Sequence, residues 1–252
     1  MVEPQSAQAA QDVLLRELAR VQRLHADRAG NPILAGALDR IANWQSRRLK
    51  MTYADLAADP RYAAAIEFFQ NDLYGTANYS QRDADLARIV PVMMRLLPEG
   101  VVMTVAAAME LNALSQELDR VLLARLPRAD GHFTVAEYCK AYRRAGNFPL
   151  RGRQVRLIGE VGAALDRYVG KPLVRTALAM MRPPAKLAGL AALQDFFERG
   201  VGAFRSMNGA EVFLQTVDTR ETAILEAIVD GASDPFPDPL SIRLAPGAPA
   251  RP

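Results

Sequence analysis

Apolar residues recur along this chain at spacings of three and four positions, the period expected when one side of an α-helix is buried. The first apolar stripe lies in residues 6–29 and consists of Val13, Leu14, Leu18, Val21 and Leu24. Alternating apolar and polar runs, which are typical of strands, are almost absent. The pattern therefore predicts an all-α protein.

Residues that start and end helices divide the rest of the chain into further segments with the same period. The predicted helices include one that begins at Pro32 and others over residues 80–97 (kinked at Pro91), 99–126, 134–144, 149–169, 172–182, 184–206 and 208–230. Together they predict a single compact bundle of roughly eight to ten helices. This helical domain covers residues 1–230, and residues 231–252 form an extended or disordered Pro-rich tail.

Three details of this pattern make specific predictions. Residues 100–114 are the most apolar stretch and are too short to cross a bilayer, which takes about 20 residues, so we expect the helix over 99–126 to lie at the centre of the bundle. Thr134 and Glu137 have the spacing of a capping box. Pro183 and Pro184 predict a break between two helices, because proline removes a backbone donor and crowds the preceding turn.

Composition is that of a folded protein, with 50% hydrophobic and 23% charged residues in a chain of 252. Cys139 is the single cysteine, so no intramolecular disulfide can form, which is typical of a reducing compartment. The first residues lack the basic start and apolar block of a secretory signal. We therefore expect a cytoplasmic protein without a transmembrane segment.

Positive charge is concentrated in residues 131–206, which hold thirteen Lys and Arg against five Asp and Glu. Such a region can attract an anionic partner or can simply be solvated. No nucleic-acid-binding motif accompanies it, so nucleic acid is not the expected partner. Residues 172–197 combine apolar side chains with basic ones, as membrane-surface helices do, but the two central prolines favour a core hairpin over peripheral membrane contact.

Metal and cofactor chemistry finds little support. His25 and His132 are the two histidines, and neither follows a glutamate at the three-residue spacing that di-iron helical bundles use. One cysteine and two distant histidines give no zinc-ligand pair, and a solvated histidine is a commoner state than a haem ligand. Cys139 has no visible activating base and reads as an inert buried thiol. We expect no metal and no cofactor.

Glu110 interrupts the apolar stretch, and Glu117 follows it on the same helix face one heptad later. A buried carboxylate either belongs to a functional site or forms a structural ion pair, and Arg88 and Arg156 are candidate partners for such a pair. Tyr138 lies on the next predicted helix and can join Glu110 in a site.

Two segments, FFQNDLYG at residues 68–75 and RDADLARIVPVMMRLLP at residues 82–98, carry a family resemblance that continues over roughly residues 55–230. They resemble an uncharacterised bacterial family of helical proteins without an assigned activity. The resemblance implies a bacterial, helical, single-domain protein and names no substrate.

The resemblance draws attention to the junction between these two segments, where charged groups and a phenol come together. The candidate ligand-binding residues there are Asp72, Tyr74, Arg82, Asp83 and Arg88. They form either a recognition site or a corner fixed by helix caps and ion pairs, since acidic residues suit a helix start and Asp85 can meet Arg88 at three-residue spacing.

Three functions stay open on the sequence alone. The first is a binding protein for a small or lipid-like ligand or a partner protein, with a groove near the DLYG junction and near helices that carry small residues such as Gly159 and Gly162. The second is a metal-independent enzyme that uses Glu110 with Tyr74 or Tyr138. The third is a structural or interaction module whose Pro-rich tail engages a partner. The oligomeric state is not predicted.

Overall fold

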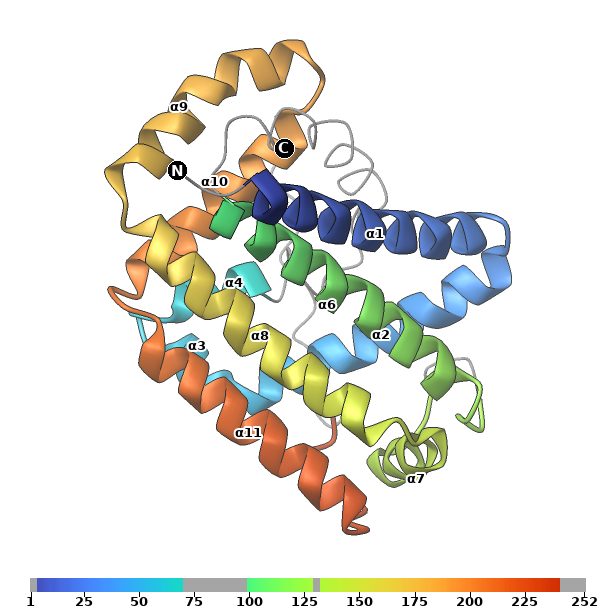
Figure 1. Cartoon of the computed structure of the whole chain (residues 1–252). Coiled ribbons are helices and arrows are strands. Elements are labelled where there is room, and N and C mark those ends of the chain that lie inside the picture. Colours follow the sequence, from blue (N-terminus) through green and yellow to red (C-terminus); the bar gives the residue numbers. More distant parts are fainter. Residues whose placement is uncertain (1–3, 70–98, 129–131, 241–252) are drawn as a thin grey trace, which may run out of the picture.

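The computed structural model describes residues 4–69, 99–128 and 132–240. These residues form ten helices and no strand, so the all-α prediction is confirmed (Figure 1). The helices are α1 (Pro4–Ala29), α2 (Pro32–Thr52), α3 (Ala54–Ala58), α4 (Ala63–Phe68), α6 (Glu99–Leu123), α7 (Val135–Ala145), α8 (Phe148–Val169), α9 (Pro172–Leu187), α10 (Ala191–Ser206) and α11 (Glu211–Val229).

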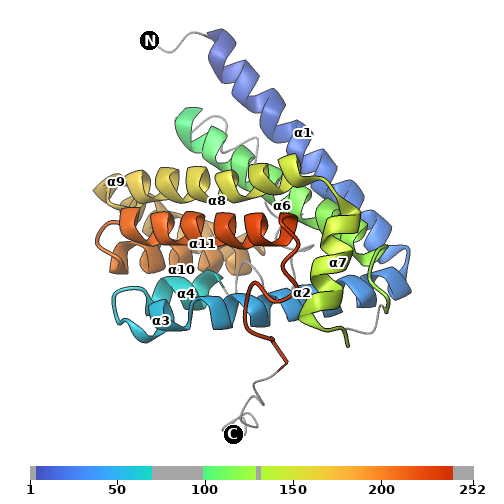
Figure 2. The ribbon, with the colours of Figure 1, turned by 90° about the horizontal axis from the view of Figure 1, so that it is seen from below.

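The helices are arranged in two layers. In the first layer α6 lies between α1 and α8, and α8 also packs against α11 (Figure 1). The second layer lies behind it and contains α2, α3, α4 and α10, as the view from below shows (Figure 2). Helix α7 covers one end of the layers, and α9 packs against α10 at the other.

Helices α1 and α6 pack against each other through the apolar stripes that the sequence shows. Leu14, Leu18 and Val21 are buried on the side of α1 that faces α6. Helix α6 contacts α1, α2, α7 and α8, which confirms its predicted central position. Burial of these stripes, rather than intrinsic helix propensity, supplies most of the stability of such helices.

The start of α7 confirms the predicted capping box. The Thr134 hydroxyl accepts a hydrogen bond from the Glu137 amide at 3.2 Å, and Glu137 Oε2 accepts one from the Thr134 amide at 2.8 Å. Both bonds satisfy backbone donors that a helix start otherwise leaves unpaired.

The predicted helix break at Pro183 and Pro184 is wrong, because both residues lie inside α9. The chain turns instead at Gly189, whose φ of 72° is readily adopted only by glycine. Residues 179–184 are exposed, so water can bind the carbonyl groups that the two prolines leave without donors. This exposure removes much of the penalty that the sequence argument assumed.

The chain after α11 returns to the domain. Phe236 is buried against Trp44 of α2 and Tyr138 of α7, with ring centroids 6.0 Å apart in each pair. Arg143 of α7 holds the same segment by donating hydrogen bonds to the carbonyl oxygens of Ile228 and Ala232. Residues 231–240 thus close one end of the core.

Candidate ligand cavity

A cavity of about 580 Å³ lies between the two layers of helices. Side chains from α1, α2, α4, α6, α8, α10 and α11 form its wall. Protein pockets that hold small molecules commonly have volumes of about 300–1,000 Å³ and mostly apolar walls. The cavity is therefore large enough for a small organic molecule.

Phenylalanine rings form one part of the wall. Phe68 and Phe69, at the end of α4, lie against Phe196 of α10 and Phe213 of α11, with centroid distances of 5.4 and 5.7 Å respectively. Helix α4 has six residues, too few to be stable alone, so these ring contacts hold it in place. Phe68 and Phe69 are also the first two residues of the FFQNDLYG segment.

Helix α6 provides a wall that changes from apolar to polar along its length. Its polar residues in the wall are spaced three and four positions apart and therefore lie on one face of the helix. After Thr104, whose hydroxyl donates to the Gly100 carbonyl oxygen, the apolar members of this face precede the polar ones. The span from Val105 to Asp119 is about 21 Å at 1.5 Å per residue. In chain order the face contains Val105, Ala108, Asn112, Ser115, Gln116 and Asp119.

Gln45 of α2 connects the polar end of this face to α7. Its Nε2 group donates hydrogen bonds to Asp119 Oδ1 at 3.0 Å and to the Tyr138 hydroxyl at 3.4 Å. Tyr138 is buried and its ring stacks on Trp44 at a centroid distance of 4.4 Å. The Asp119 side chain is thereby held in a fixed position at the cavity wall.

Gln154 of α8 completes this polar end. Its Nε2 group donates to Ser115 Oγ at 2.8 Å, and its Oε1 atom accepts from Arg151 Nη1 at 3.2 Å. Arg151 is 5% exposed, and its other guanidinium nitrogen donates to the Leu118 carbonyl oxygen at 3.2 Å. Arg151 lies outside the cavity lining, so Gln154 stands between its charge and the cavity.

Two carboxyl groups in the wall have opposite electrostatic environments. Burial raises the pKa of Asp119, although the charges of Arg151 and Arg28 and the hydrogen bond from Gln45 oppose the shift. At Glu221 burial is outweighed by Arg48, and hydrogen bonds from Arg48 and Tyr53 add to the effect, so the pKa of Glu221 is lowered. Glu221 is thus held as an anion, whereas Asp119 holds its proton more readily than an exposed aspartate.

The low pKa of Glu221 has a clear geometric basis. Arg48 donates to Glu221 through Nη1 at 2.6 Å and Nη2 at 2.8 Å, and the Tyr53 hydroxyl donates to the same carboxylate at 2.8 Å. The side chains of Arg48 and Glu221 are 14% and 13% exposed, so this bidentate pair is largely shielded from water. It ties α2 to α11 at the edge of the cavity.

Glu110 and Glu117, two of the candidate site residues, lie on the other side of α6. At about 100° per residue they point roughly opposite to Asn112 and Asp119. Glu110 pairs with Arg153 of α8 at 3.1 Å, not with Arg156, and its side chain is 31% exposed. Glu117 pairs with Arg20 of α1, whose Nε donates to it at 2.7 Å. The structure therefore shows both residues in ion pairs between helices of one layer.

The other candidate residues are dispersed. Tyr138 contacts the polar end of the cavity through Gln45 without lining the cavity itself. Arg156 is exposed on α8. The candidates at the DLYG junction lie outside the described residues: Asp72, Tyr74, Arg82, Asp83, Asp85 and Arg88.

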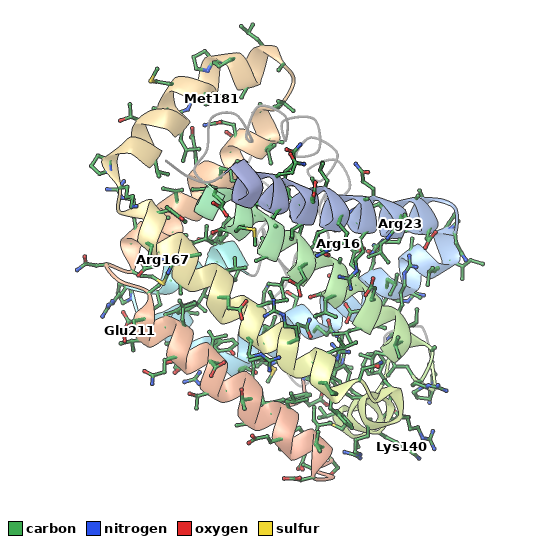
Figure 3. The ribbon with its side chains drawn as sticks, in the orientation of Figure 1. Arg16, Arg23, Lys140, Arg167, Met181 and Glu211 are labelled. Carbon is green, nitrogen blue, oxygen red and sulfur yellow. The ribbon has the colours of Figure 1, made fainter. Side chains whose placement is uncertain are left out.

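Several charged side chains away from the cavity point outward. Arg16, Arg23, Arg167 and Glu211 project from the outside of the helices (Figure 3). Lys140, in the basic region 131–206, is exposed in the same way. This placement keeps these charges away from the cavity, where an unpaired charge is unfavourable.

Four residues at the polar end of the cavity were not among the site residues predicted from the sequence: Asp119, Gln45, Ser115 and Gln154. A signal for the α6 residues was present, because Asn112, Ser115 and Asp119 repeat at helical spacing on the most central helix. Glu110 was predicted as a site residue because it interrupts an apolar run, but its side chain faces α8. Gln45 and Gln154 carry no local signal, since exposed glutamines are common on helices.

Glycine positions separate helix packing from the cavity. A Cβ atom added to Gly162 would lie 2.3 Å from Leu214 Cδ2, so Gly162 allows α8 and α11 to approach closely. Gly159, one turn earlier on α8, has no such neighbour within 4 Å. Close packing of α8 on α11 therefore explains the glycine at position 162 but not the glycine at position 159.

Comparison with known proteins identifies the family. The sequence profile described as domain of unknown function (DUF8198) matches residues 22–235. The chain belongs to this family. The match confirms the expected membership of a family without an assigned activity. No curated protein and no solved structure matches the chain.

The DUF8198 range contains every described residue of the cavity wall, from His25 to Glu221. The cavity is therefore part of the DUF8198 domain. None of the described helices is both long and apolar enough to cross a membrane. Within the same part of the chain, no three His, Cys, Asp or Glu side chains come together as metal ligands would.

Proposed function

We propose that this protein binds a small, mainly apolar molecule in the cavity between its helical layers. The observation that carries the proposal is the volume of about 580 Å³ together with a wall that is apolar along most of its surface and polar at one end of α6. A cavity of this size exceeds the packing defects of ordinary protein cores, which are seldom larger than a water molecule. A bound molecule would restore the contacts that the wall side chains lack.

Two further features support a binding role. Phe68 and Phe69 place the described part of the FFQNDLYG segment in the cavity wall, close to where a groove is expected. The polar side chains of the wall come from several helices and are fixed by mutual hydrogen bonds, as in preformed ligand sites. Glu110 has no part in this proposal, because it faces α8 and pairs with Arg153.

The proposal also includes the cellular location of the protein. Cys139 is fully buried, and burial raises its pKa to about 11, so the thiol is unreactive toward oxidants at neutral pH. A single protected thiol is compatible with the cytoplasmic location that we propose. The ligand would then be a molecule of the cell interior.

Native mass spectrometry of the protein purified from its own host tests the proposal directly. Comparison of native and denatured samples should show a reproducible mass difference that corresponds to one retained small molecule. The wild-type protein stripped of ligand should also bind one equivalent of a neutral apolar fluorophore such as N-phenyl-1-naphthylamine.

Substitution of Ala108 distinguishes the cavity from other binding surfaces. Ala108 faces the cavity from the middle of α6, so Ala108→Trp should fill part of the space and weaken fluorophore binding by about tenfold or more. Ala124 is exposed just after α6, and Ala124→Trp is the matched control that should bind as the wild type does. Equal binding by both variants would refute the cavity as the site.

A further inference from the structure

Resting on the proposed function, we infer that the ligand is an amphipathic amine whose protonated nitrogen binds Asp119 while its apolar body occupies the phenylalanine-lined part of the cavity. The inference concerns the polar end of the wall, where Asp119 of α6 meets Gln45 of α2. Three observations lead to it: the state of the hydrogen-bonding groups, the distribution of charge, and the length of the α6 face.

At Asp119 and Gln45 the groups left for a ligand are acceptors, not donors. Both N–H groups of Gln45 are used, one on Asp119 Oδ1 and one on the Tyr138 hydroxyl. The Ser115 hydroxyl donates to the Leu111 carbonyl oxygen at 2.7 Å. Within the described residues, Asp119 Oδ2 and Gln45 Oε1 have no hydrogen-bond partner, and both residues line the cavity. A ligand group that donates hydrogen bonds would satisfy both oxygens.

The charge at this end favours a cation over a neutral donor. Of the carboxylates that line the described wall, Glu221 is paired with Arg48 and Asp39 with Arg28, whereas Asp119 has no ion-pair partner within 4.0 Å among the described residues. Arg151 is separated from the cavity by Gln154 and directs its guanidinium toward Gln154 and Leu118. A carboxylate that faces a low-dielectric cavity gains most from a cation at contact distance.

The geometry of α6 sets the shape of the ligand. Ala108 and Val105 precede Asp119 on one helix face by about three to four turns. Phe68 and Phe196 line the same cavity, so a linear apolar chain that extends from Asp119 along this face would enter the space that their rings border. The primary ammonium group at its end has three donors and can bind Asp119 Oδ2 and Gln45 Oε1 together.

Calorimetric titration with three probes that differ in one group tests the inference. Decylamine, decanol and decanoate share an apolar chain and differ in the charge of the polar end. Wild-type protein at about pH 7 should bind decylamine roughly tenfold more tightly than decanol, and decanoate most weakly. Asp119→Asn should remove this preference for the amine, so that the decylamine and decanol affinities become similar.

Glu110→Gln is the matched control, because it removes a carboxylate from the opposite face of the same helix and should keep the preference for the amine. Retention of the preference in Asp119→Asn would overturn the role of Asp119. Similar affinities for all three probes in the wild type, or a preference for decanoate, would overturn the amine and leave the proposed function standing. Failure of all three to bind would instead count against the proposed function as well.

The pH dependence of wild-type binding gives a second test that needs no variant. Protons compete with the amine for Asp119, so decylamine affinity should fall as the solution is acidified through the pKa of this carboxyl, while decanol affinity stays constant. The groups that act directly on Asp119 are Gln45 from α2, Arg28 with its partner Asp39 from α1 and α2, Arg151 from α8 and Tyr138 from α7. The other titratable residues that line the described cavity wall are His25 of α1, Glu221 of α11 and Tyr53. An amine affinity that is independent of pH in this range would overturn the inference.

Discussion

Asp119 and Glu221 line the same cavity, yet their surroundings shift their pKa values in opposite directions. At Glu221 burial is outweighed by the charge of Arg48 together with three hydrogen bonds from Arg48 and Tyr53. At Asp119 burial outweighs the charges of Arg151 and Arg28 and the one hydrogen bond from Gln45. Burial without a matched cation is a feature of residues kept for function more often than for stability.

Replacement of Asp119 should therefore stabilise the ligand-free protein. The raised pKa means that the folded state binds a proton more tightly than the unfolded state, so the wild type loses stability as pH rises from the ordinary value of 3.8 through the raised pKa. Asn cannot titrate and escapes this loss. We expect Asp119→Asn to increase the free energy of unfolding by about 1 kcal/mol near pH 7 and by less in acid, as measured by urea denaturation.

Glu221→Gln provides a control of opposite sign in the same denaturation series. Its lowered pKa means that Glu221 stabilises the fold above the ordinary value of 4.5, and that this contribution is lost as pH falls through the lowered pKa. The variant should lose about 3 kcal/mol near pH 7, because Arg48 stays buried without its partner. If Asp119→Asn is also destabilising near pH 7, the unfavourable burial of Asp119 is refuted.

At the scale of single residues, the sequence predicts burial better than it predicts partners. Thr134 and Glu137 form their capping box as expected, because a cap depends on residues three positions apart. Glu110 was expected to meet Arg88 or Arg156 if structural, but it meets Arg153. Helical spacing assigns Glu110 to one face of α6. Which arginine lies opposite depends on how α6 packs against α8.

Among the elements, α8 contains two glycines with different reasons for being there. Gly159 has open space at its Cβ position, whereas Gly162 lies against Leu214 of α11. Alanine stabilises a helix interior by about 1 kcal/mol relative to glycine where space allows. Gly159→Ala should therefore raise the free energy of unfolding. In thermal denaturation, the free energy of unfolding of Gly159→Ala should be higher than that of Gly162→Ala by about 1 kcal/mol or more. Equal effects of the two substitutions would show that α8 and α11 can separate without penalty.

A helix boundary can be predicted from the sequence where residues close to it in the chain determine it. The prediction is wrong where the boundary depends on how exposed the helix is in the folded protein. The apolar stripe of α1 and the central position of α6 follow from period alone. Pro183 and Pro184 did not end α9, because the exposed helix lets water satisfy the freed carbonyl groups. Exposure is a property of the assembled molecule, so a local rule about proline could not include it.

In the molecule as a whole, the cavity was beyond the reach of sequence patterns. A helix face that combines Val105 and Ala108 with Ser115 and Asp119 has the same pattern whether another helix or an empty space lies opposite. Gln45 and Asp119 are 74 positions apart along the chain. Their contact depends on how the two layers pack, which the helical period of either segment does not specify.

Because the cavity lies between the layers, a ligand should stabilise both layers at once. Helices α2, α6, α8, α10 and α11 line the cavity, whereas α7 and α9 contribute none of the described lining residues. Near saturation, at about a hundredfold excess over Kd, binding adds about 2.7 kcal/mol to stability. Hydrogen exchange with decylamine should therefore slow at amides that open locally in the lining helices and stay unchanged at fraying amides of α7 and α9.

Ala108→Trp is the control for this exchange experiment, since a partly filled cavity should show a smaller protection than the wild type at the same decylamine concentration. Protection confined to α9 would contradict the cavity and would point to its surface, where Met180 and Leu187 are 72% and 90% exposed. Protection confined to one layer would be equally incompatible, because Gln45 and Asp119 contribute to the wall from different layers. The extent of protection thus tests whether the two layers act as one binding site, which single-residue substitutions cannot show.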